Sequence, residues 1–160
     1  MNCFKTLVLV AALTLPVQAQ QASDPNRLYI PVTLEGTRQL IAGARRSVWM
    51  MAPTLGRLEI VQALALKAQS GVAVRLLLTN VRGVDPNALA LSKRPNIDAR
   101  WSPQQLGATA IVIDDLHLVL MVVGNPKNTP NSMEVLNRPE IAGSMRQRIE
   151  WIFQQSRRLR

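Results

Sequence analysis

The sequence has almost no cysteine and few aromatic residues. Its one cysteine, Cys3, lies near the N-terminus, and Phe, Tyr and Trp together make up 4% of the 160 residues. A disulfide framework and a catalytic thiol further along the chain are therefore excluded. The single histidine, His117, leaves no His/Cys cluster with metal-ligand spacing, and no glycine-rich phosphate loop is present. We expect neither a metal nor another cofactor.

Acidic residues are also scarce. Ten Asp and Glu residues stand against nineteen Lys and Arg residues, which gives a net charge of +9 at pH 7. This excess favours a polyanionic partner, either nucleic acid or an anionic membrane surface, although arginines also serve simply to keep a surface soluble. The candidates for holding phosphate groups are the arginines near the C-terminus: Arg146, Arg148, Arg157 and Arg158. The solvated face of an amphipathic helix has the same composition.

The chain lacks any hydrophobic run long enough to span a membrane. Its first 19 residues instead have the order of a secretory signal peptide: Lys5, an apolar run over Leu7–Leu15, and a cleavage site after Ala19. We therefore expect an exported protein of a bacterial periplasm. The expected organisation after cleavage is a polar N-terminal arm over residues 20–31 and one domain over residues 32–160.

Aliphatic residues are plentiful, and their spacing alternates between helix and strand patterns. Helices are predicted over residues 34–46, 58–70, 86–91 and 138–157, and strands over 47–51, 72–78, 97–101, 108–113, 116–123 and 133–136. Because residues 47–78 read as strand, helix and strand, the two strands of this βαβ unit should be parallel. The predicted fold class is α/β, with a mixed, largely parallel sheet flanked by helices on both faces.

Two segments resemble the phospholipase D-like superfamily. The first runs from Ser47-Val-Trp-Met-Met51 through a helix to Ala-Gln-Ser-Gly-Val-Ala-Val-Arg-Leu-Leu-Leu, which ends at residue 78. The second, Asn137-Arg-Pro-Glu-Ile-Ala through Trp151 and Ser156, is similar to the family's last helix. Single-motif periplasmic endonucleases and cardiolipin hydrolase relatives are the nearest in size. The resemblance implies phosphodiester hydrolysis of lipid or nucleic acid, by two motifs that face each other from two halves or two chains without a metal.

The family's catalytic motif is broken in this sequence. In the family, the strand corresponding to residues 108–113 belongs to a His-x-Lys-x-x-x-x-Asp motif, whose His forms a covalent phosphoenzyme and whose Lys binds the phosphate. With Asp114 at the Asp position, the His position is Gly107 and the Lys position is Thr109. Glycine offers no nucleophile, and threonine supplies no charge for the non-bridging oxygens. The resemblance therefore carries over only Asp114, as a remnant of the site.

The Gly-Ser-x-Asn segment that follows the motif in the family is also absent. Gly124-Asn125, Asn128 and Asn131-Ser132 are loose echoes of it. Asn125 and Asn131, together with Glu134 in the next strand, are the remaining candidates for substrate contacts.

His117 and the tryptophans are the other side chains with a chemical use. His117 should share a strand face with Val119, and it is the only histidine that could replace the missing nucleophile, although an ordinary strand or turn histidine is the simpler interpretation. Trp101 is the tryptophan expected at the surface, where it could stack on a base, whereas Trp49 and Trp151 fall at core-like positions.

Two functions remain open. The first is a catalytically degenerate, exported phospholipase D-like protein that acts as a binding or assembly module for a polyanion or a protein partner. Such a protein could form a homodimer or a heterodimer with an intact relative. The second is an active periplasmic phosphodiesterase, of nuclease or phospholipase D type, with an atypical site that uses His117.

Overall fold

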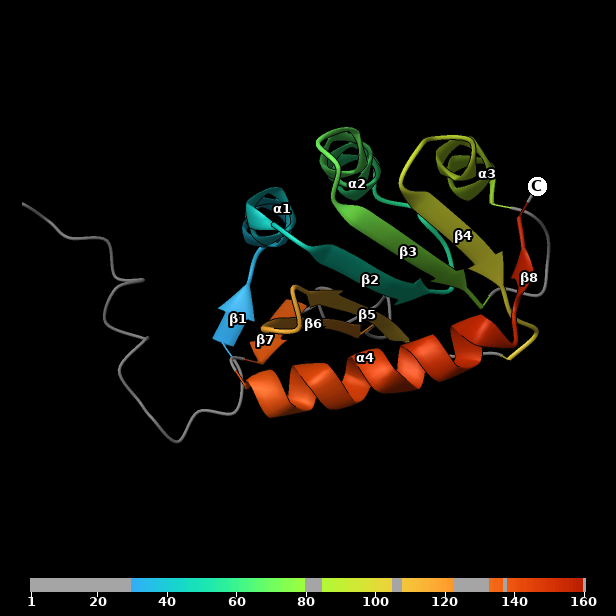
Figure 1. Ribbon diagram of the computed structural model, residues 1–160. Helices are drawn as coiled ribbons and strands as arrows, with labels where there is room; N and C mark the ends of the chain where they lie inside the picture. Colours follow the sequence, from blue (N-terminus) through green and yellow to red (C-terminus); the bar gives the residue numbers. More distant parts are fainter. Residues whose placement is uncertain (1–29, 80–84, 105–107, 123–132, 137, 160) are drawn as a thin grey trace, which may run out of the picture.

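The structure is a computed structural model that describes residues 30–79, 85–104, 108–122, 133–136 and 138–159. These residues form one eight-stranded sheet and four helices (Figure 1). In chain order the elements are β1 (Ile30–Val32), α1 (Leu34–Gly43), β2 (Ser47–Ala52), α2 (Leu58–Gln69), β3 (Ala73–Leu78), α3 (Pro86–Ser92), β4 (Ile97–Trp101), β5 (Ala108–Ile113), β6 (His117–Val122), β7 (Met133–Leu136), α4 (Pro139–Gln154) and β8 (Arg157–Arg158).

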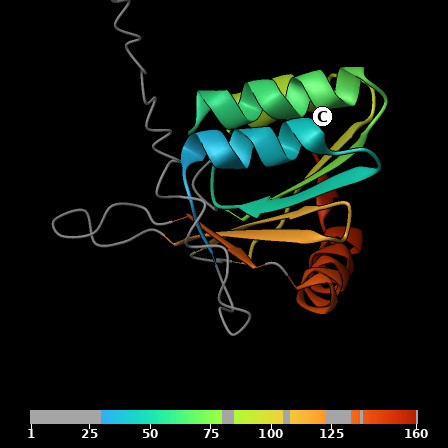
Figure 2. The ribbon, with the colours of Figure 1, turned by 90° about the vertical axis from the view of Figure 1, so that its left-hand side faces the viewer.

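The sheet is mixed, and helices cover both of its faces, as the sequence predicted. Helices α1, α2 and α3 lie on one face and α4 lies on the other (Figures 1 and 2). The strand order is β1-β7-β6-β5-β2-β3-β4-β8. Strands β2 and β3 are parallel, with Met50 opposite Leu76, which confirms the βαβ unit.

The expectation that most of the sheet would be parallel is corrected by the pairing. Only β2 with β3 and β3 with β4 are parallel, and the remaining pairings are antiparallel. For β5 and β6 the reason is local: three residues, 114–116, join the two strands, and a connection this short can only reverse the chain. The other antiparallel pairings join segments that are further apart in the sequence. Apolar composition alone could not separate these buried antiparallel strands from parallel ones.

Several element ends follow the expected local chemistry. The Thr33 side chain accepts a hydrogen bond of 3.0 Å from the Gly36 amide and caps α1. Asp85 caps α3 by accepting from the amides of Asn87 and Ala88. Gly71 ends the α2 region with a φ of 90°, a conformation that favours glycine.

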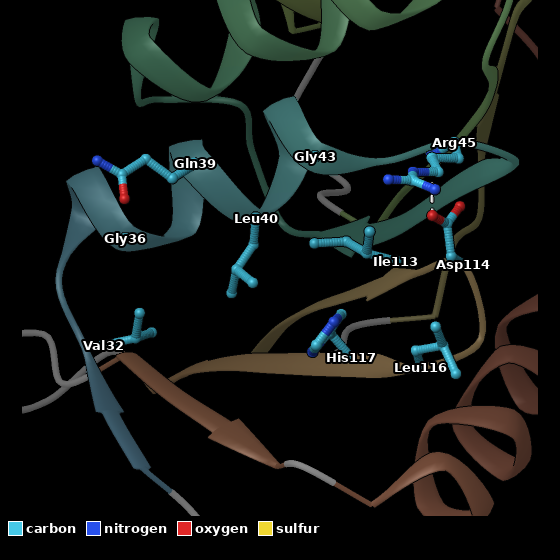
Figure 3. A pocket seen from close by; sticks show the side chains of 10 residues that line it. All are labelled: Val32, Gly36, Gln39, Leu40, Gly43, Arg45, Ile113, Asp114, Leu116 and His117. Carbon is cyan, nitrogen blue, oxygen red and sulfur yellow. Dashed lines mark hydrogen bonds between the residues drawn. The ribbon is translucent and has the colours of Figure 1, made fainter. Parts of the chain in front are cut away.

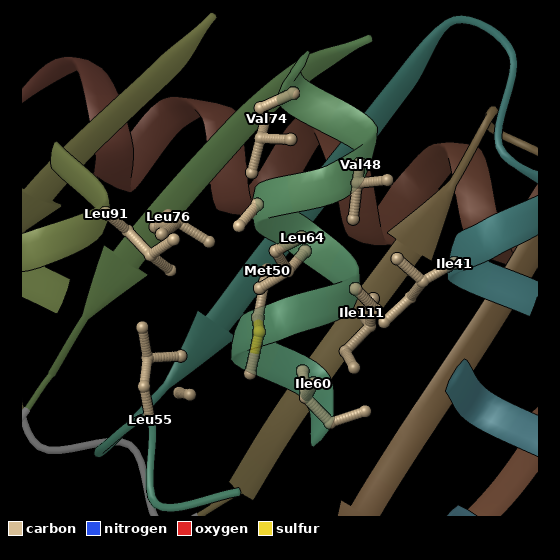
Figure 4. Packing of buried hydrophobic residues seen from close by; sticks show 14 of the residues in the cluster. Ile41, Val48, Met50, Leu55, Ile60, Leu64, Val74, Leu76, Leu91 and Ile111 are labelled. Atoms are coloured by element: carbon tan, nitrogen blue, oxygen red, sulfur yellow. The ribbon is translucent and has the colours of Figure 1, made fainter. Parts of the chain in front are cut away.

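Buried side chains form two apolar layers, one on each face of the sheet. The larger layer packs α1, α2 and α3 onto the sheet and includes Ile41, Leu64 and Leu76 (Figure 4). The smaller layer packs Ile149, Ile152 and Phe153 of α4 against the other face. Strand β5 serves both layers, because Ile111 and Ile113 point to the first and Ala110 and Val112 to the second.

The C-terminal segment differs from the sequence prediction. Helix α4 ends at Gln154, three residues earlier than predicted, and Arg157–Arg158 form β8 on the edge of β4. The Leu159 amide donates a 2.9 Å hydrogen bond to the Ala99 carbonyl, and Leu159 packs against the larger apolar layer. Backbone pairing with an otherwise open strand edge thus replaces the last helical turn.

Two tryptophans also differ from prediction. Trp151 was expected in the core but is 59% exposed on α4, whereas Trp101, expected at the surface, is partly buried against the larger layer. Trp49 agrees with prediction: it is partly buried and makes an edge-to-face contact with Phe153, with ring centroids 5.5 Å apart.

At the N-terminal side, the sheet begins at Ile30, so β1 includes two residues that were expected in the arm. Within the described ranges, no helix combines the length and the apolarity needed to cross a membrane. The segment expected to be a signal peptide lies outside the described residues.

Candidate functional site

The Asp114-Asp115 pair makes the tight turn between β5 and β6. Both residues have left-handed backbone conformations, with φ of 54° and 61°. Asp and Asn adopt this conformation more readily than most residues, because their short side chains can bond nearby backbone. The Leu116 amide closes the turn by donating to the Ile113 carbonyl at 2.9 Å.

The Asp114 carboxylate binds the connection between α1 and β2. One oxygen accepts from the Arg45 amide at 2.8 Å, and the other accepts from the amides of Arg46 at 2.8 Å and Ser47 at 2.9 Å. The Arg46 guanidinium donates to the Asp114 carbonyl oxygen. Three amides about 70 residues earlier in the chain are therefore satisfied by one carboxylate, which fixes α1 and β2 to the hairpin.

The same contacts determine the ionisation of Asp114. Partial burial opposes the charged form, but the hydrogen bonds from the amides of Ser47, Arg45 and Arg46, with the Arg46 charge, outweigh it and lower the pKa of this carboxyl. Asp114 is thus a charged group whose two oxygens are both engaged by backbone.

Thr109 lies at the other end of β5 from Asp114. Asp114 is five positions further along the chain, and five steps of extended strand span about 17 Å. Next to Thr109, Ala110 pairs with Met51, so position 109 lies near the carboxyl end of β2. The Thr109 side chain is 8% exposed and lines a narrow cavity of about 30 Å³. Arg57 is the only ionisable residue in the lining, which otherwise consists of Met50, Thr54, Leu55, Gly56, Ile60 and Met121.

His117 lies at the turn end of the hairpin, opposite Ile113 at the start of β6. Its neighbour on the same strand face, Val119, belongs to the larger apolar layer, which confirms the predicted alternation. Met121, opposite Thr109, is four residues further on, so His117 and Thr109 are separated by about 13 Å along the hairpin. The structure therefore does not bring His117 to position 109.

A larger cavity of about 710 Å³ lies at this turn end, between α1 and the hairpin (Figure 3). His117 and Asp114 line it, together with Val32, Gly36, Gln39, Leu40, Gly43, Arg45, Ile113 and Leu116. Sequence reasoning missed the cavity and Arg45 as one of its charged groups. The spacing of Gly36, Leu40 and Gly43 on one face of α1 was the available signal.

The four candidate arginines fall into two kinds. Arg146 is already neutralised, because it forms ion pairs with Asp115 at 3.0 Å and Glu150 at 2.6 Å. Arg158 lies 3.4 Å from Asp98, which also pairs with Arg100. Arg148 and Arg157 are exposed and form no ion pair with the described part of the chain.

Four further candidate residues lie outside the described residues or are described only by their backbone. Gly107, Asn125 and Asn131 lie outside the described residues. Glu134 is described only through the backbone of β7, where it stands opposite Leu120 and Pro31. In the ranges that the structure covers, no group of three His, Cys, Asp or Glu residues is placed to hold a metal ion.

Comparison with known proteins gives a fold but no close relative. No protein-family model matches the chain, and no curated protein matches it. Among solved structures, the chain is similar to Nuc from Salmonella typhimurium, described as a phospholipase D family member: 20% identity over 77% of this chain and 88% of that one, with a TM-score of 0.63. NucT from Helicobacter pylori is 16% identical over 81% of this chain and 96% of that one, with a TM-score of 0.67.

A third similar structure is a DNA-binding protein. TrmBL2, an archaeal chromatin protein whose structure is described as showing a novel mode of DNA binding, is 12% identical over 88% of this chain and 57% of that one, with a TM-score of 0.64. Identities this low establish the shared fold and leave function to the residues of the site. The chain therefore has the fold of the phospholipase D-like superfamily, as its resemblance to that family implied.

Proposed function

We propose that this chain is an exported, catalytically degenerate phospholipase D-like domain that binds a polyanion. The observation that carries the proposal is Thr109 at the position of the family's lysine. Its side chain is uncharged and buried, and among the described residues that line its cavity only Arg57 carries a charge. Gly107, at the histidine position, has no side chain that could attack phosphorus.

Covalent catalysis on a phosphodiester needs a nucleophile next to cations that stabilise the transferred oxygens. The only histidine of the chain is about 13 Å from Thr109 along the hairpin. Asp114 is about 17 Å away, and its oxygens are occupied by backbone amides. These separations support the loss of the family's chemistry at this edge of the sheet.

The binding role rests on the exposed face of α4 and the adjacent β8. Arg148 and Arg157 are exposed and free of ion pairs with the described residues, and Trp151 is 59% exposed, three residues from Arg148 on α4. Arginines attract phosphates without sequence preference, and an exposed indole can stack on a base. The similarity to TrmBL2, a chromatin protein that binds DNA, supports this role.

The test of degeneracy is hydrolysis of bis-(p-nitrophenyl) phosphate by the purified chain beside Gly107→His/Thr109→Lys. We expect no turnover by the native chain and measurable turnover by the double variant, with Tm measured to establish that the variant is folded. The proposal is contradicted if the native chain hydrolyses the substrate and the activity elutes together with the chain in chromatography.

Binding is tested by fluorescence anisotropy with a labelled single-stranded oligonucleotide at two salt concentrations. We expect Arg148→Gln/Arg157→Gln and Trp151→Ala each to weaken binding about tenfold, since a stacked base contributes roughly 1–3 kcal/mol. Arg94→Gln is the matched control, because Arg94 is exposed but belongs to the segment between α3 and β4. Equal affinities for the variants and the control would remove the α4 surface from the proposal.

Export is tested separately. Expression of the full chain in a bacterium, followed by N-terminal sequencing of the protein in the periplasmic fraction, should give a mature chain that begins at Gln20. A cytoplasmic protein with an intact first segment would contradict this part of the proposal.

The second candidate function is an active phosphodiesterase that uses His117. It is favoured by one observation: His117 and Arg45, a histidine and a cation, line the same cavity of about 710 Å³. In this case the native chain should hydrolyse the phosphodiester and His117→Ala should abolish the activity. A rate unchanged by His117→Ala rules out this candidate.

A further inference from the structure

The cavity of about 710 Å³ is shaped by glycines on α1. Gly36, Leu40 and Gly43 follow one face of the helix and line the cavity together. Gly36 is required where it stands, because a Cβ there would lie 2.6 Å from Val32 Cγ2. Gly43 has no such neighbour: a Cβ there would meet nothing within 4 Å. The helix therefore leaves open space beside the hairpin instead of packing onto it.

The walls of this space are mainly aliphatic. Leu40, Ile113 and Leu116 surround it, and Leu116 remains 48% exposed although it is a large apolar side chain. The volume is in the range typical of small-molecule sites, roughly 300–1,000 Å³. An apolar ligand would remove this surface from water, at roughly 25 cal/mol per Å².

The polar groups that line the cavity differ in whether they are free to bind a ligand. The Arg45 guanidinium and the His117 imidazole form no hydrogen bond or ion pair with the described residues, whereas both Asp114 oxygens accept backbone amides. Figure 3 places Arg45 and Asp114 at one end of the cavity and Val32 at the other, with His117 between them. The donors of Arg45 and His117 therefore face a mainly apolar volume, and the Asp114 carboxylate, the one acidic group among the described lining residues, accepts hydrogen bonds from three backbone amides.

We propose that this cavity binds a small amphipathic anion: a carboxylate that Arg45 and His117 hold, on an apolar chain that lies along Leu40, Ile113 and Leu116. Charge complementarity selects the anionic head, and the aliphatic walls select the chain. The site is at the opposite end of β5 from Thr109, so it does not depend on the proposed polyanion surface or on the loss of catalysis.

The probe is decanoate, measured by isothermal titration calorimetry with the purified chain, and decanol is its uncharged counterpart. We expect one decanoate site with submillimolar affinity and at least tenfold weaker binding of decanol. Arg45→Gln should weaken decanoate binding about tenfold and leave decanol unchanged, whereas Arg94→Gln should change neither.

Gly43→Leu is the sharper variant, because its side chain would grow into the cavity. Gly143→Leu is its matched control: Gly143 also has open space at its Cβ, but it lies on α4 across the sheet. We expect Gly43→Leu to abolish decanoate binding with an unchanged Tm, and Gly143→Leu to bind decanoate as the native chain does.

The proposal is overturned if the native chain does not bind 1 mM decanoate, which is the result expected if another segment of the chain fills the cavity. Equal binding by the two leucine variants, or equal affinity for decanol and decanoate, overturns it as well.

Discussion

The two ends of the β5–β6 hairpin carry two positions of one broken motif: Asp114, which the chain retains, and Thr109, which stands at the lysine position. The surroundings of these two residues differ. At the turn end, Asp114 accepts three backbone amides and has a lowered pKa. At the open end, the Thr109 side chain lines a narrow, mostly apolar cavity and forms no hydrogen bond with the described residues. The Asp114 carboxylate thus holds two elements of the fold together although the family's His and Lys are absent from the motif's other positions.

The largest expected effect comes from removing the Asp114 carboxylate. Asp114→Ala leaves the amides of Arg45, Arg46 and Ser47 without their acceptor and places alanine at a φ of 54°. We expect a loss of about 2–4 kcal/mol in the free energy of unfolding, measured by urea denaturation. Thr109→Val, at the other end, should change stability by less than about 1 kcal/mol, because the Thr109 hydroxyl forms no hydrogen bond with the part of the chain that the structure describes. Similar losses in the free energy of unfolding for both variants would show that the two ends of the hairpin contribute equally to stability.

A smaller effect is expected in the pH dependence of stability. The folded pKa of Asp114 is below its ordinary value of 3.8, so its contribution is fully present above that value and is lost as the pH falls through the folded pKa. The free energy of unfolding of the native chain should therefore exceed that of Asp114→Asn at about pH 6, and the difference should shrink as the pH is lowered to about 3. Urea titrations of both proteins across this range measure the difference. Glu35, which also has a lowered pKa, is present in both proteins and does not affect the comparison. A difference that stays constant with pH would show that the charge of Asp114 contributes nothing.

The smallest effect concerns the link between the turn and α4. Arg146 pairs with Asp115 of the turn and with Glu150 of its own helix, and its side chain is 27% exposed. Ion pairs this accessible contribute up to about 1 kcal/mol. Arg146→Gln should therefore lower the free energy of unfolding by about 1 kcal/mol or less, and by less still in 1 M salt. The control is Arg148→Gln on the same helix, which should be neutral. A loss as large as that of Asp114→Ala would show that the turn depends on α4 as much as on α1 and β2.

Much of the fold could be predicted because its signals are local. Thr33 and Asp85 cap helices, Gly71 follows one, and the βαβ unit over β2, α2 and β3 comes from contiguous apolar patterns. The proportion of antiparallel pairing and β8 could not be predicted, because strand pairing depends on partners far away in the chain. Trp151 shows the same limit: helical spacing placed it near the core face, but the position of α4 against the sheet left it 59% exposed.

The candidate site divides in a similar way. The absence of His and Lys at positions 107 and 109 is visible in the sequence once the motif is aligned on Asp114. The cavity beside His117 is not, because it needs Val32 from β1, Gly43 from α1 and Leu116 from the turn. The helical spacing of Gly36, Leu40 and Gly43 marks one wall of the cavity, but no pattern within one segment shows that residues of three segments enclose a space.

The sequence by itself determined the four helices, the strands β2 to β7, the caps at Thr33 and Asp85, and the lack of a nucleophile and a cation at positions 107 and 109, since these depend on residue identity and near-neighbour spacing. Only the tertiary structure decided the roles of the residues that remain. It bound Asp114 to the amides of residues 45–47, paired Arg146 with Asp115, and left Arg45 and His117 beside an apolar cavity. The physical reason is that a charged or polar side chain acquires its role from the donors and acceptors that folding brings to it, and these come from distant parts of the chain.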